Sequence, residues 1–279
     1  MTCQSICNYY EDQLKSLFSK RELREIIALA FSKSNNWNKV DISMNKFSHL
    51  NKSEVDFHKS VVQKLLAHQP IQYILENVHF YNLSLLVKPG VLIPRPETEE
   101  LVSWVLTHVF DDASFLDIGT GSGCIALAIK ANTNRSDVCA IDQSKYAIEI
   151  AKENGSSLNL DVNFLVDDIL NPKINNKWDF IISNPPYIPR ADKNFMEDNV
   201  LKYEPHTALF VDDNNPLFFY EKIANFSLKH LKKRGCIFFE IHSNMGFKIV
   251  ELLASLGFKD IEIKKDLQGK DRMIKANLK

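Results

Sequence analysis

The segment WDFIISNPPYIPR, residues 178–190, ends an apolar run with Asn184, two prolines and Tyr187. Proline has no backbone N–H, so the chain offers carbonyl acceptors and few donors at this point. Asn184 adds a side-chain oxygen. The Asn184 oxygen and the Pro185 carbonyl can together hold both hydrogens of a planar –NH2 group. The nitrogen lone pair then turns toward an electrophile, and Tyr187 can cover the flat face of the substrate.

Such a nitrogen is a poor nucleophile because its lone pair is delocalised, so its partner has to be a strong electrophile such as a sulfonium methyl group. Positioning the two at about 3–3.5 Å supplies much of the acceleration. We expect no metal, nucleophilic side chain or general base. Asn184, Pro185 and Tyr187 are therefore the predicted catalytic residues of a methyl transfer. The alternative is structural, because Asn-Pro-Pro also ends strands in turns.

A glycine loop lies upstream in DIGTGSG, where Gly119, Gly121 and Gly123 are three of the nine glycines of the chain. Glycine permits close approach of the backbone to a ligand, and a loop between a strand and a helix binds nucleotide-like ligands. Cys124 occupies the position of the third glycine of the dinucleotide fingerprint, so the spacing favours a ligand without a pyrophosphate. A tight turn with no ligand is the alternative.

Acidic residues follow the next two predicted strands. Asp142 ends the first of them, where an acidic side chain can bind both ribose hydroxyls. One strand further, Asp167, Asp168 and Ile169 are expected to border an adenine. Together with the glycine loop, these residues predict a nucleoside-containing cofactor.

The motifs need a parallel sheet to bring them together. From residue 113 onward strands alternate with helices, which predicts an α/β fold with a doubly wound, mostly parallel sheet covered on both faces. If the fourth strand lies beside the first at the point where the winding reverses, Asn184 faces the glycine loop. The predicted strands are 114–117, 138–141, 162–166, 179–183, 236–240, 260–264 and 273–276. The predicted helices are about 122–132, 144–157, 216–232 and 245–256.

The first third of the chain predicts a small helical unit. Ser19 and Glu22 have the spacing of a capping box, and a second helix, 53–68, ends before Pro70. Residues 77–88 predict a β-hairpin around Asn82, and Pro96 sits at the first position of the next helix. We assign residues 1–73 to an N-terminal helical domain, 74–94 to a hairpin linker and 95–279 to the catalytic domain.

Composition excludes several classes of protein. The net charge of −1 argues against a dedicated nucleic-acid binder. No apolar run approaches the length of about 20 residues that spans a bilayer, and the N-terminus lacks the features of a signal peptide. The five cysteines are scattered without C-x-x-C spacing, which argues against disulfides and zinc. We expect a cytoplasmic protein.

Four segments, LIPRPETEELV, DIGTGSGCIALA, AIDQS and WDFIISNPPYI, together resemble the protein-(glutamine-N5) methyltransferases that modify peptide chain release factors. The resemblance covers nearly the whole chain, including the YEPHTALF and KDLQGKDRMI segments. Asn-Pro-Pro-Tyr is shared with DNA and RNA amino-methyltransferases. The IPRPETE segment is more particular to the glutamine enzymes.

This resemblance implies the seven-stranded fold of class I methyltransferases, S-adenosyl-L-methionine as cofactor, and the glutamine of the Gly-Gly-Gln motif in class-I release factors as substrate. It also implies partner binding by the helical domain. Carried over by position, the cofactor would contact Gly119, Thr120, Gly121, Ser122, Gly123, Asp142, Ile169 and Asn184. The glutamine amide would contact Asn184, Pro185, Pro186 and Tyr187. Arg95 and Glu97 would shape the site from the linker side. We expect a monomer that forms no stable complex with nucleic acid or membrane.

The chain departs from the family pattern at His242 and Met245, where a glycine and a glutamine are expected, and at Glu76-Asn77, where a glycine usually opens the hairpin. We expect His242 to be a surface or packing residue. Two other function classes stay open. An amino-methyltransferase acting on a flipped base needs a target-recognition region and a basic surface. A non-catalytic scaffold has no need of the glycines, Asp142 and Asn184 together.

Overall fold

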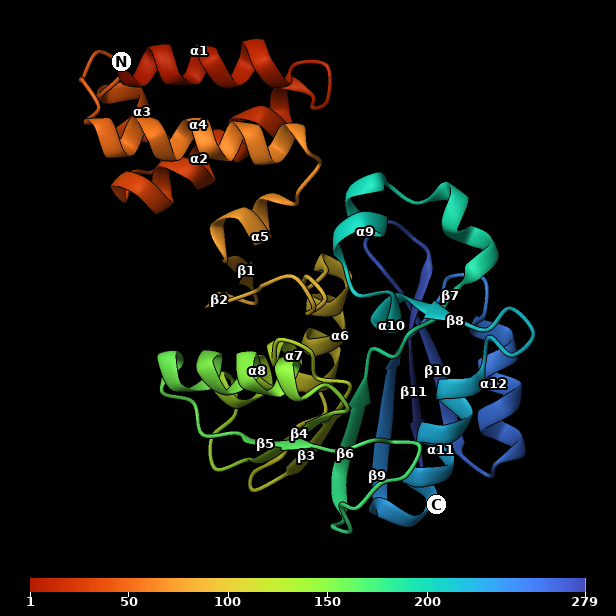
Figure 1. Cartoon of the computed structure of the whole chain (residues 1–279). Coiled ribbons are helices and arrows are strands. Elements are labelled where there is room, and N and C mark those ends of the chain that lie inside the picture. Colours follow the sequence, from red (N-terminus) through yellow and green to blue (C-terminus); the bar gives the residue numbers. More distant parts are fainter. Residues whose placement is uncertain (279) are drawn as a thin grey trace. The chain divides into compact units, whose positions relative to one another are not determined.

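The computed structural model describes residues 1–278 and divides into two compact units. The first consists of Met1–Glu76 and Glu197–Tyr203, and the second consists of Asn77–Met196 and the chain from Glu204 onward. Figure 1 shows residues 1–76 of the first unit as helices in red and orange, the segment 197–203 of the same unit in blue-green, and the second unit as a sheet with helices, from yellow to blue. Partner binding by the helical unit stays a prediction.

Amphipathic helices build the first unit around one apolar core. The predicted capping box is confirmed: Glu22 N donates to Ser19 Oγ (3.3 Å) and Ser19 N donates to a Glu22 carboxylate oxygen (2.7 Å). The second predicted helix, 53–68, is also confirmed, one residue earlier at its start and two at its end. The helices are α1 (Cys3–Leu14), α2 (Lys20–Asn35), α3 (Lys39–Met44), α4 (Lys52–Leu66), α5 (Ile71–Leu75) and the separate α9 (Asp198–Tyr203).

His58 of α4 is a buried titratable side chain in this unit, with an exposed fraction of 0%. Its Nδ1 lies 3.1 Å from the Tyr10 hydroxyl and its Nε2 lies 3.2 Å from the Ser34 hydroxyl. Burial lowers the pKa of His58 from 6.5 to about 4. The His58 ring is therefore neutral in the folded unit near pH 7.

We expect the helical unit to lose stability in acid. Because the pKa of His58 is lowered in the folded unit, the unfolded chain takes up the proton first as the pH falls. The contribution of neutral His58 to the free energy of unfolding is complete above pH 6.5, decreases as the pH drops toward 4, and changes no further below that pH. The loss amounts to about 3 kcal/mol. Hydrogen-exchange protection of α4 peptides, corrected for the intrinsic pH dependence of exchange, measures it. The His58→Gln variant should lack this component, and an unchanged pH dependence in that variant would contradict the assignment.

The second unit contains a seven-stranded sheet in the order β10-β11-β9-β6-β3-β4-β5. Pairing is parallel from β9 through β5, whereas β11 runs antiparallel to both β9 and β10. The winding direction reverses between β3 and β6, which confirms the doubly wound fold. The strands are β3 (Ser114–Ile118), β4 (Asp137–Asp142), β5 (Asn163–Val166), β6 (Trp178–Ser183), β9 (Leu231–Glu240), β10 (Lys259–Lys265) and β11 (Asp271–Asn277).

Helices cover both faces of this sheet (Figure 1). Alternate side chains of β6 face opposite layers: Phe180 and Ile182 pack with α6 and α7, whereas Ile181 packs with α11 and α12. A strand buried on both sides explains the unbroken apolar run that precedes Asn184. The helices are α6 (Pro96–Leu106), α7 (Cys124–Ala131), α8 (Lys145–Leu158), α11 (Phe218–His230) and α12 (Gly246–Ser255).

The predicted hairpin is present as β1 (Val78–Phe80) and β2 (Leu83–Leu85) and belongs to the second unit. Tyr81 and Asn82 form its two-residue turn with φ of +47° and +64°, the conformation that suits the twist of paired strands. Phe80 and Leu85 are buried in the same core as α6 and α7. Glu76 has φ of +51°, a left-handed conformation that a glycine adopts without strain.

Short elements between β6 and α11 were not predicted. Besides α9 of the first unit, they are β7 (Ile188–Pro189), the 3-10 helix η1 (Arg190–Phe195), α10 (His206–Leu209) and β8 (Phe210–Val211), and β7 pairs with β8 in parallel. Within residues 1–278, no helix is long and apolar enough to cross a membrane.

Candidate active site

One pocket lies at the carboxyl ends of β3, β4 and β6. Ile118 of β3 is in register with Ile141 of β4 and with Ser183 of β6, so the segments that follow these strands begin side by side. The predicted site residues that line the pocket are Gly119, Thr120, Gly121, Ser122, Asp142, Asp167, Asp168, Ile169, Asn184, Pro185 and Pro186. The fold therefore brings the predicted cofactor and substrate motifs to one place.

Two neighbours hold the glycine loop. Gly119 N and Thr120 N both donate to the Ile141 carbonyl, at 2.9 and 3.0 Å. The buried Asp117 carboxylate accepts from the Thr120 hydroxyl (2.6 Å) and from Ala126 N (3.3 Å), which ties the loop to the first turn of α7. Burial raises the pKa of Asp117 to about 7. The glycine loop is thus held by the end of β4 and by the Asp117 carboxyl group.

Asp142 links the glycine loop to the next helix. One carboxylate oxygen accepts from Gly121 N at 2.9 Å, and the other accepts from Ser144 N at 2.8 Å. Burial raises the pKa of Asp142, while these two backbone donors lower it. Each carboxylate oxygen has a further lone pair, so the side chain can still accept hydrogen bonds from a diol in the pocket.

The loop after β5 presents an apolar surface. The Asp167 carboxylate accepts backbone N–H groups of Asp168, Lys173 and Ile174 at 2.9–3.1 Å. Its acceptor capacity is therefore used largely within its own loop. Ile169 also lines the pocket and adds an apolar side chain to it.

Gly119 and Gly123 have the same left-handed backbone and different surroundings. Gly119 has φ of +76°, lines the pocket, and has open space where a Cβ atom would stand. Gly123 has φ of +84° and lies outside the pocket lining, and a Cβ there would stand 3.1 Å from Ala151 Cβ and 3.2 Å from both Leu127 and Phe164. In this structure Gly123 caps the N-terminus of α7 and packs against side chains of α7, α8 and β5, and its contact with a cofactor stays a prediction.

We expect alanine to act differently at these two glycines. Both variants strain the backbone by about 1–2 kcal/mol, but Gly123→Ala adds steric crowding of about 1–3 kcal/mol. Gly119→Ala places its methyl group in the pocket and should weaken cofactor binding instead. Denaturant unfolding and calorimetric titration with S-adenosylhomocysteine measure the two effects. Equal losses of stability in both variants would show that the packing around Gly123 is not responsible.

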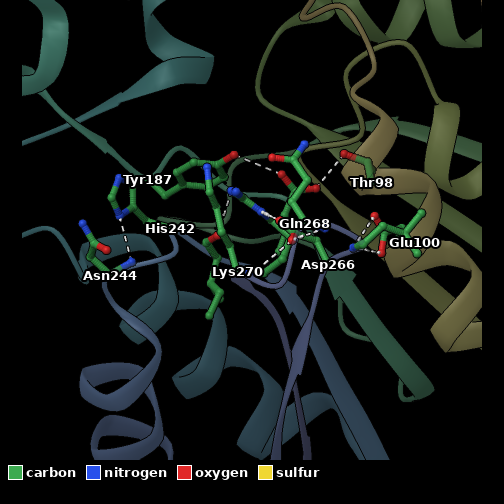
Figure 2. Close-up of polar contacts among 12 residues, drawn as sticks. Thr98, Glu100, Tyr187, His242, Asn244, Asp266, Gln268 and Lys270 are labelled. Carbon is green, nitrogen blue, oxygen red and sulfur yellow. Dashed lines mark hydrogen bonds and ion pairs between the residues drawn. The ribbon is translucent and has the colours of Figure 1, made fainter. Parts of the chain in front are cut away.

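Asn184 is held by a side chain that the sequence did not single out. Its Nδ2 donates to the Thr98 hydroxyl at 3.2 Å, and Thr98 in turn donates to the Glu240 carboxylate at 2.6 Å. Tyr187 lies outside the pocket lining, and its hydroxyl donates to the other Glu240 oxygen at 3.0 Å. Figure 2 shows Thr98 and Tyr187 with their bonds to this carboxylate. Glu240 ends an apolar strand with an acid, as Asp142 does, and this pattern could have indicated it.

Arg95 is joined to a second buried carboxylate. Its Nη2 lies 2.7 Å from a Glu204 carboxylate oxygen, and the other Glu204 oxygen accepts from Ile93 N at 3.2 Å. Arg95 lines the pocket, whereas the predicted Glu97 lies outside that lining. Glu204 belongs to the YEPHTALF segment, which the resemblance had indicated as a segment without assigning a role to this residue.

His242 has the contacts of a packing side chain. Its ring lies edge-on to Tyr187 with 6.1 Å between ring centres, and its Nδ1 accepts from Asn244 N at 3.3 Å (Figure 2). Burial lowers the pKa of His242, which favours the neutral ring. Met245 stands at the start of α12, away from the pocket lining. Within residues 1–278, no group of His, Cys, Asp and Glu side chains is placed to hold a metal ion.

Known proteins are similar to this chain in sequence and in fold. A family model described as methyltransferase small domain matches residues 97–202. The release factor glutamine methyltransferase of Flavobacterium psychrophilum is 38% identical over 246 residues, 86% of each chain. The protein of the same name from Streptococcus pneumoniae is 44% identical over 200 residues, 71% of each chain. A methyltransferase structure from Pyrococcus furiosus shares the fold, with a TM-score of 0.54, 18% identity, and coverage of 77% of this chain and 96% of that one.

Proposed function

The chain belongs to the family of release factor glutamine methyltransferases, and from this premise we propose its reaction: transfer of a methyl group from S-adenosyl-L-methionine to the side-chain amide nitrogen (N5) of the glutamine in the Gly-Gly-Gln motif of class-I peptide chain release factors. The observation that carries the proposal is the placement of Asn184 and Pro185 beside the glycine loop, at the switch point between β3 and β6.

The pocket fits S-adenosylmethionine on its own chemistry. The space in front of Gly119 is open to a ligand, the Asp142 carboxylate can accept ribose hydroxyls, and Ile169 can pack against adenine. We therefore assign these residues, with Thr120, Gly121 and Ser122, to cofactor binding. When bound, the cofactor supplies an electrophilic methyl group on a positively charged sulfur.

The chain's own residues hold the substrate nitrogen. The Asn184 side-chain oxygen and the Pro185 carbonyl accept the two amide hydrogens, which orients the nitrogen lone pair toward the glycine loop. Pro186 and Tyr187 limit the space on the flat faces of the amide. Positioning of this kind replaces a catalytic base, because the proton of the substrate nitrogen can leave after the transfer.

The remaining assignments follow from the same proposal. The helical unit, or part of it, binds the release factor, and Arg95 and Glu97 shape the side of the site that faces the hairpin. The protein acts as a monomer in the cytoplasm, where translation terminates, and needs no stable complex with nucleic acid.

Transfer of a labelled methyl group tests the proposal. The protein, labelled S-adenosylmethionine and a cognate class-I release factor should yield label on the factor. A release factor whose Gly-Gly-Gln glutamine is replaced is the matched control and should stay unlabelled. Label that persists on that control, or that appears only on added DNA or RNA, would contradict the proposal.

A further inference from the structure

Glu240 is a buried carboxylate for which the proposed reaction gives no role. It ends β9 with an exposed fraction of 1%. Each of its oxygens accepts one hydroxyl: Thr98 donates to one at 2.6 Å, and Tyr187 donates to the other at 3.0 Å. Figure 2 shows Thr98 and Tyr187 on opposite sides of this group. Tyr187 of the substrate motif and Thr98, which contacts Asn184, come from distant parts of the sequence and therefore meet on one acceptor.

The proton of Thr98 decides which way the Asn184 amide faces. A hydroxyl has a single proton, and Thr98 gives it to Glu240. Toward Asn184 the Thr98 oxygen can then only accept, so Asn184 has to present its Nδ2, which lies 3.2 Å away. In the flipped amide the Asn184 oxygen would face the Thr98 oxygen with no proton between them. The carboxylate thereby turns the Asn184 oxygen away from Thr98.

We propose that Glu240, acting through Thr98, is a positioning residue that fixes the Asn184 amide with its oxygen as the acceptor for the substrate –NH2 group. This inference rests on the proposed function, because only a substrate that donates hydrogens needs an acceptor there. An Asn184 amide turned the other way would present its own hydrogens to the substrate nitrogen and repel it.

A second carboxylate, that of Asp266, holds a cation that acts on Glu240. Arg272 of β11 acts electrostatically on Glu240, and its Nε is fixed 3.2 Å from Asp266. Asp266 also accepts Gln268 N and Lys270 N at 2.9 Å in the β10–β11 turn (Figure 2). Burial raises the pKa of Glu240, and the hydrogen bonds of Thr98 and Tyr187 and the charge of Arg272 lower it, while Glu97 raises it slightly. The C-terminal hairpin thus contributes a cation that favours the acceptor form of Glu240.

Three variants test the path from Glu240 to Asn184. Thr98→Val removes the hydroxyl and keeps the shape, and should lower kcat with the release factor about 100-fold. Thr98→Ser restores the hydroxyl and should stay within about threefold of wild type. Glu240→Gln has one acceptor oxygen for two hydroxyl donors, so a share of the molecules reverses the bond to Thr98; we expect a loss of about tenfold. The affinity for S-adenosylhomocysteine should be unchanged in all three.

A double-mutant cycle shows whether Glu240 acts through Thr98. Once Thr98 is valine, adding Glu240→Gln should lower kcat by less than about twofold, because the path is already broken. Losses that multiply, with tenfold in either background, would overturn the inference. Ser227→Ala, which removes another fully buried hydroxyl on α11, is the matched control and should retain wild-type kcat.

The outcomes separate this inference from the proposed function. If wild-type protein transfers no label to the release factor, the proposed function fails. If wild-type protein transfers label and Thr98→Val matches it, the function stands and the positioning role of Thr98 and Glu240 is wrong. A general loss of structure would lower the unfolding temperature and the cofactor affinity of Thr98→Val, and a serine that fails to restore kcat would also count against the inference.

Discussion

Replacing Asn184 by alanine is expected to lower the turnover of the release factor about 100- to 1000-fold. The Asn184 oxygen is one of the two acceptors that hold the substrate –NH2 group, and without it the nitrogen can rotate away from the methyl group. Cofactor affinity should change little, because the glycine loop and Asp142 remain intact. Single-turnover methylation and calorimetric titration with S-adenosylhomocysteine measure the two quantities separately.

A matched control exists for this variant. Asn225 lies on the exposed side of α11 and donates to the Glu221 carbonyl, so Asn225→Ala should retain turnover. Contact of Asn184 with the cofactor is the other role that the family resemblance implies for this residue, and the same experiment tests it. A loss of cofactor affinity as large as the loss of turnover would make Asn184 a cofactor ligand in place of a substrate ligand.

Asp142→Ala is expected to show the opposite pattern. A carboxylate that accepts two ribose hydroxyls contributes about 1.5–3 kcal/mol for each bond, so the Kd of the cofactor should rise about 100-fold or more. Turnover at saturating cofactor should fall much less, because Asn184 and Pro185 are untouched. Initial rates measured over a range of cofactor concentrations resolve the two effects.

The structure gives a second reason for the expected rise in the Kd of the cofactor. Asp142 also holds Gly121 N and Ser144 N, so its removal loosens the glycine loop as well as the ribose site. Asp137→Ala, at the exposed other end of β4, controls for a general effect on the strand. A normal Kd in Asp142→Ala together with low turnover would contradict its assignment to the cofactor.

The strands of the seven-stranded sheet were predictable because their apolar runs, and the motifs that end some of them, are local in sequence. Each predicted strand overlaps an observed one, and the end of β6 at Ser183 agrees with the prediction. The beginning of β9 was missed: Lys232, Lys233 and Arg234 extend the strand to Leu231, although such a charged run has little strand propensity. Leu231 pairs with Trp178 and Cys236 pairs with Phe180 of β6, so the charged residues lie in an irregular stretch between two paired positions, which no local pattern indicates.

Helix α1 was missed for a related reason. Its sequence, CQSICNYYEDQL, is rich in residues of modest helix propensity. Burial of Cys3, Ile6, Tyr10 and Leu14 against the other helices stabilises it. Tertiary packing of one apolar face, which no local pattern measures, therefore decides the conformation.

The support of Asn184 could not be predicted, because it joins residues far apart in the chain. Thr98 precedes Asn184 by 86 positions and Glu240 by 142. Only the sheet order, with β9 beside β6, brings the ends of these segments together. The motif itself is visible in the sequence, and the side chains that orient it become visible only in the fold.

The most direct test of the central claim is a crystal structure of the protein with S-adenosylhomocysteine and a class-I release factor. The account predicts that the side-chain nitrogen of the Gly-Gly-Gln glutamine lies about 3 Å from both the Asn184 Oδ1 atom and the Pro185 carbonyl oxygen. A glutamine nitrogen bound by other atoms, or an Asn184 oxygen directed away from it, would contradict the account.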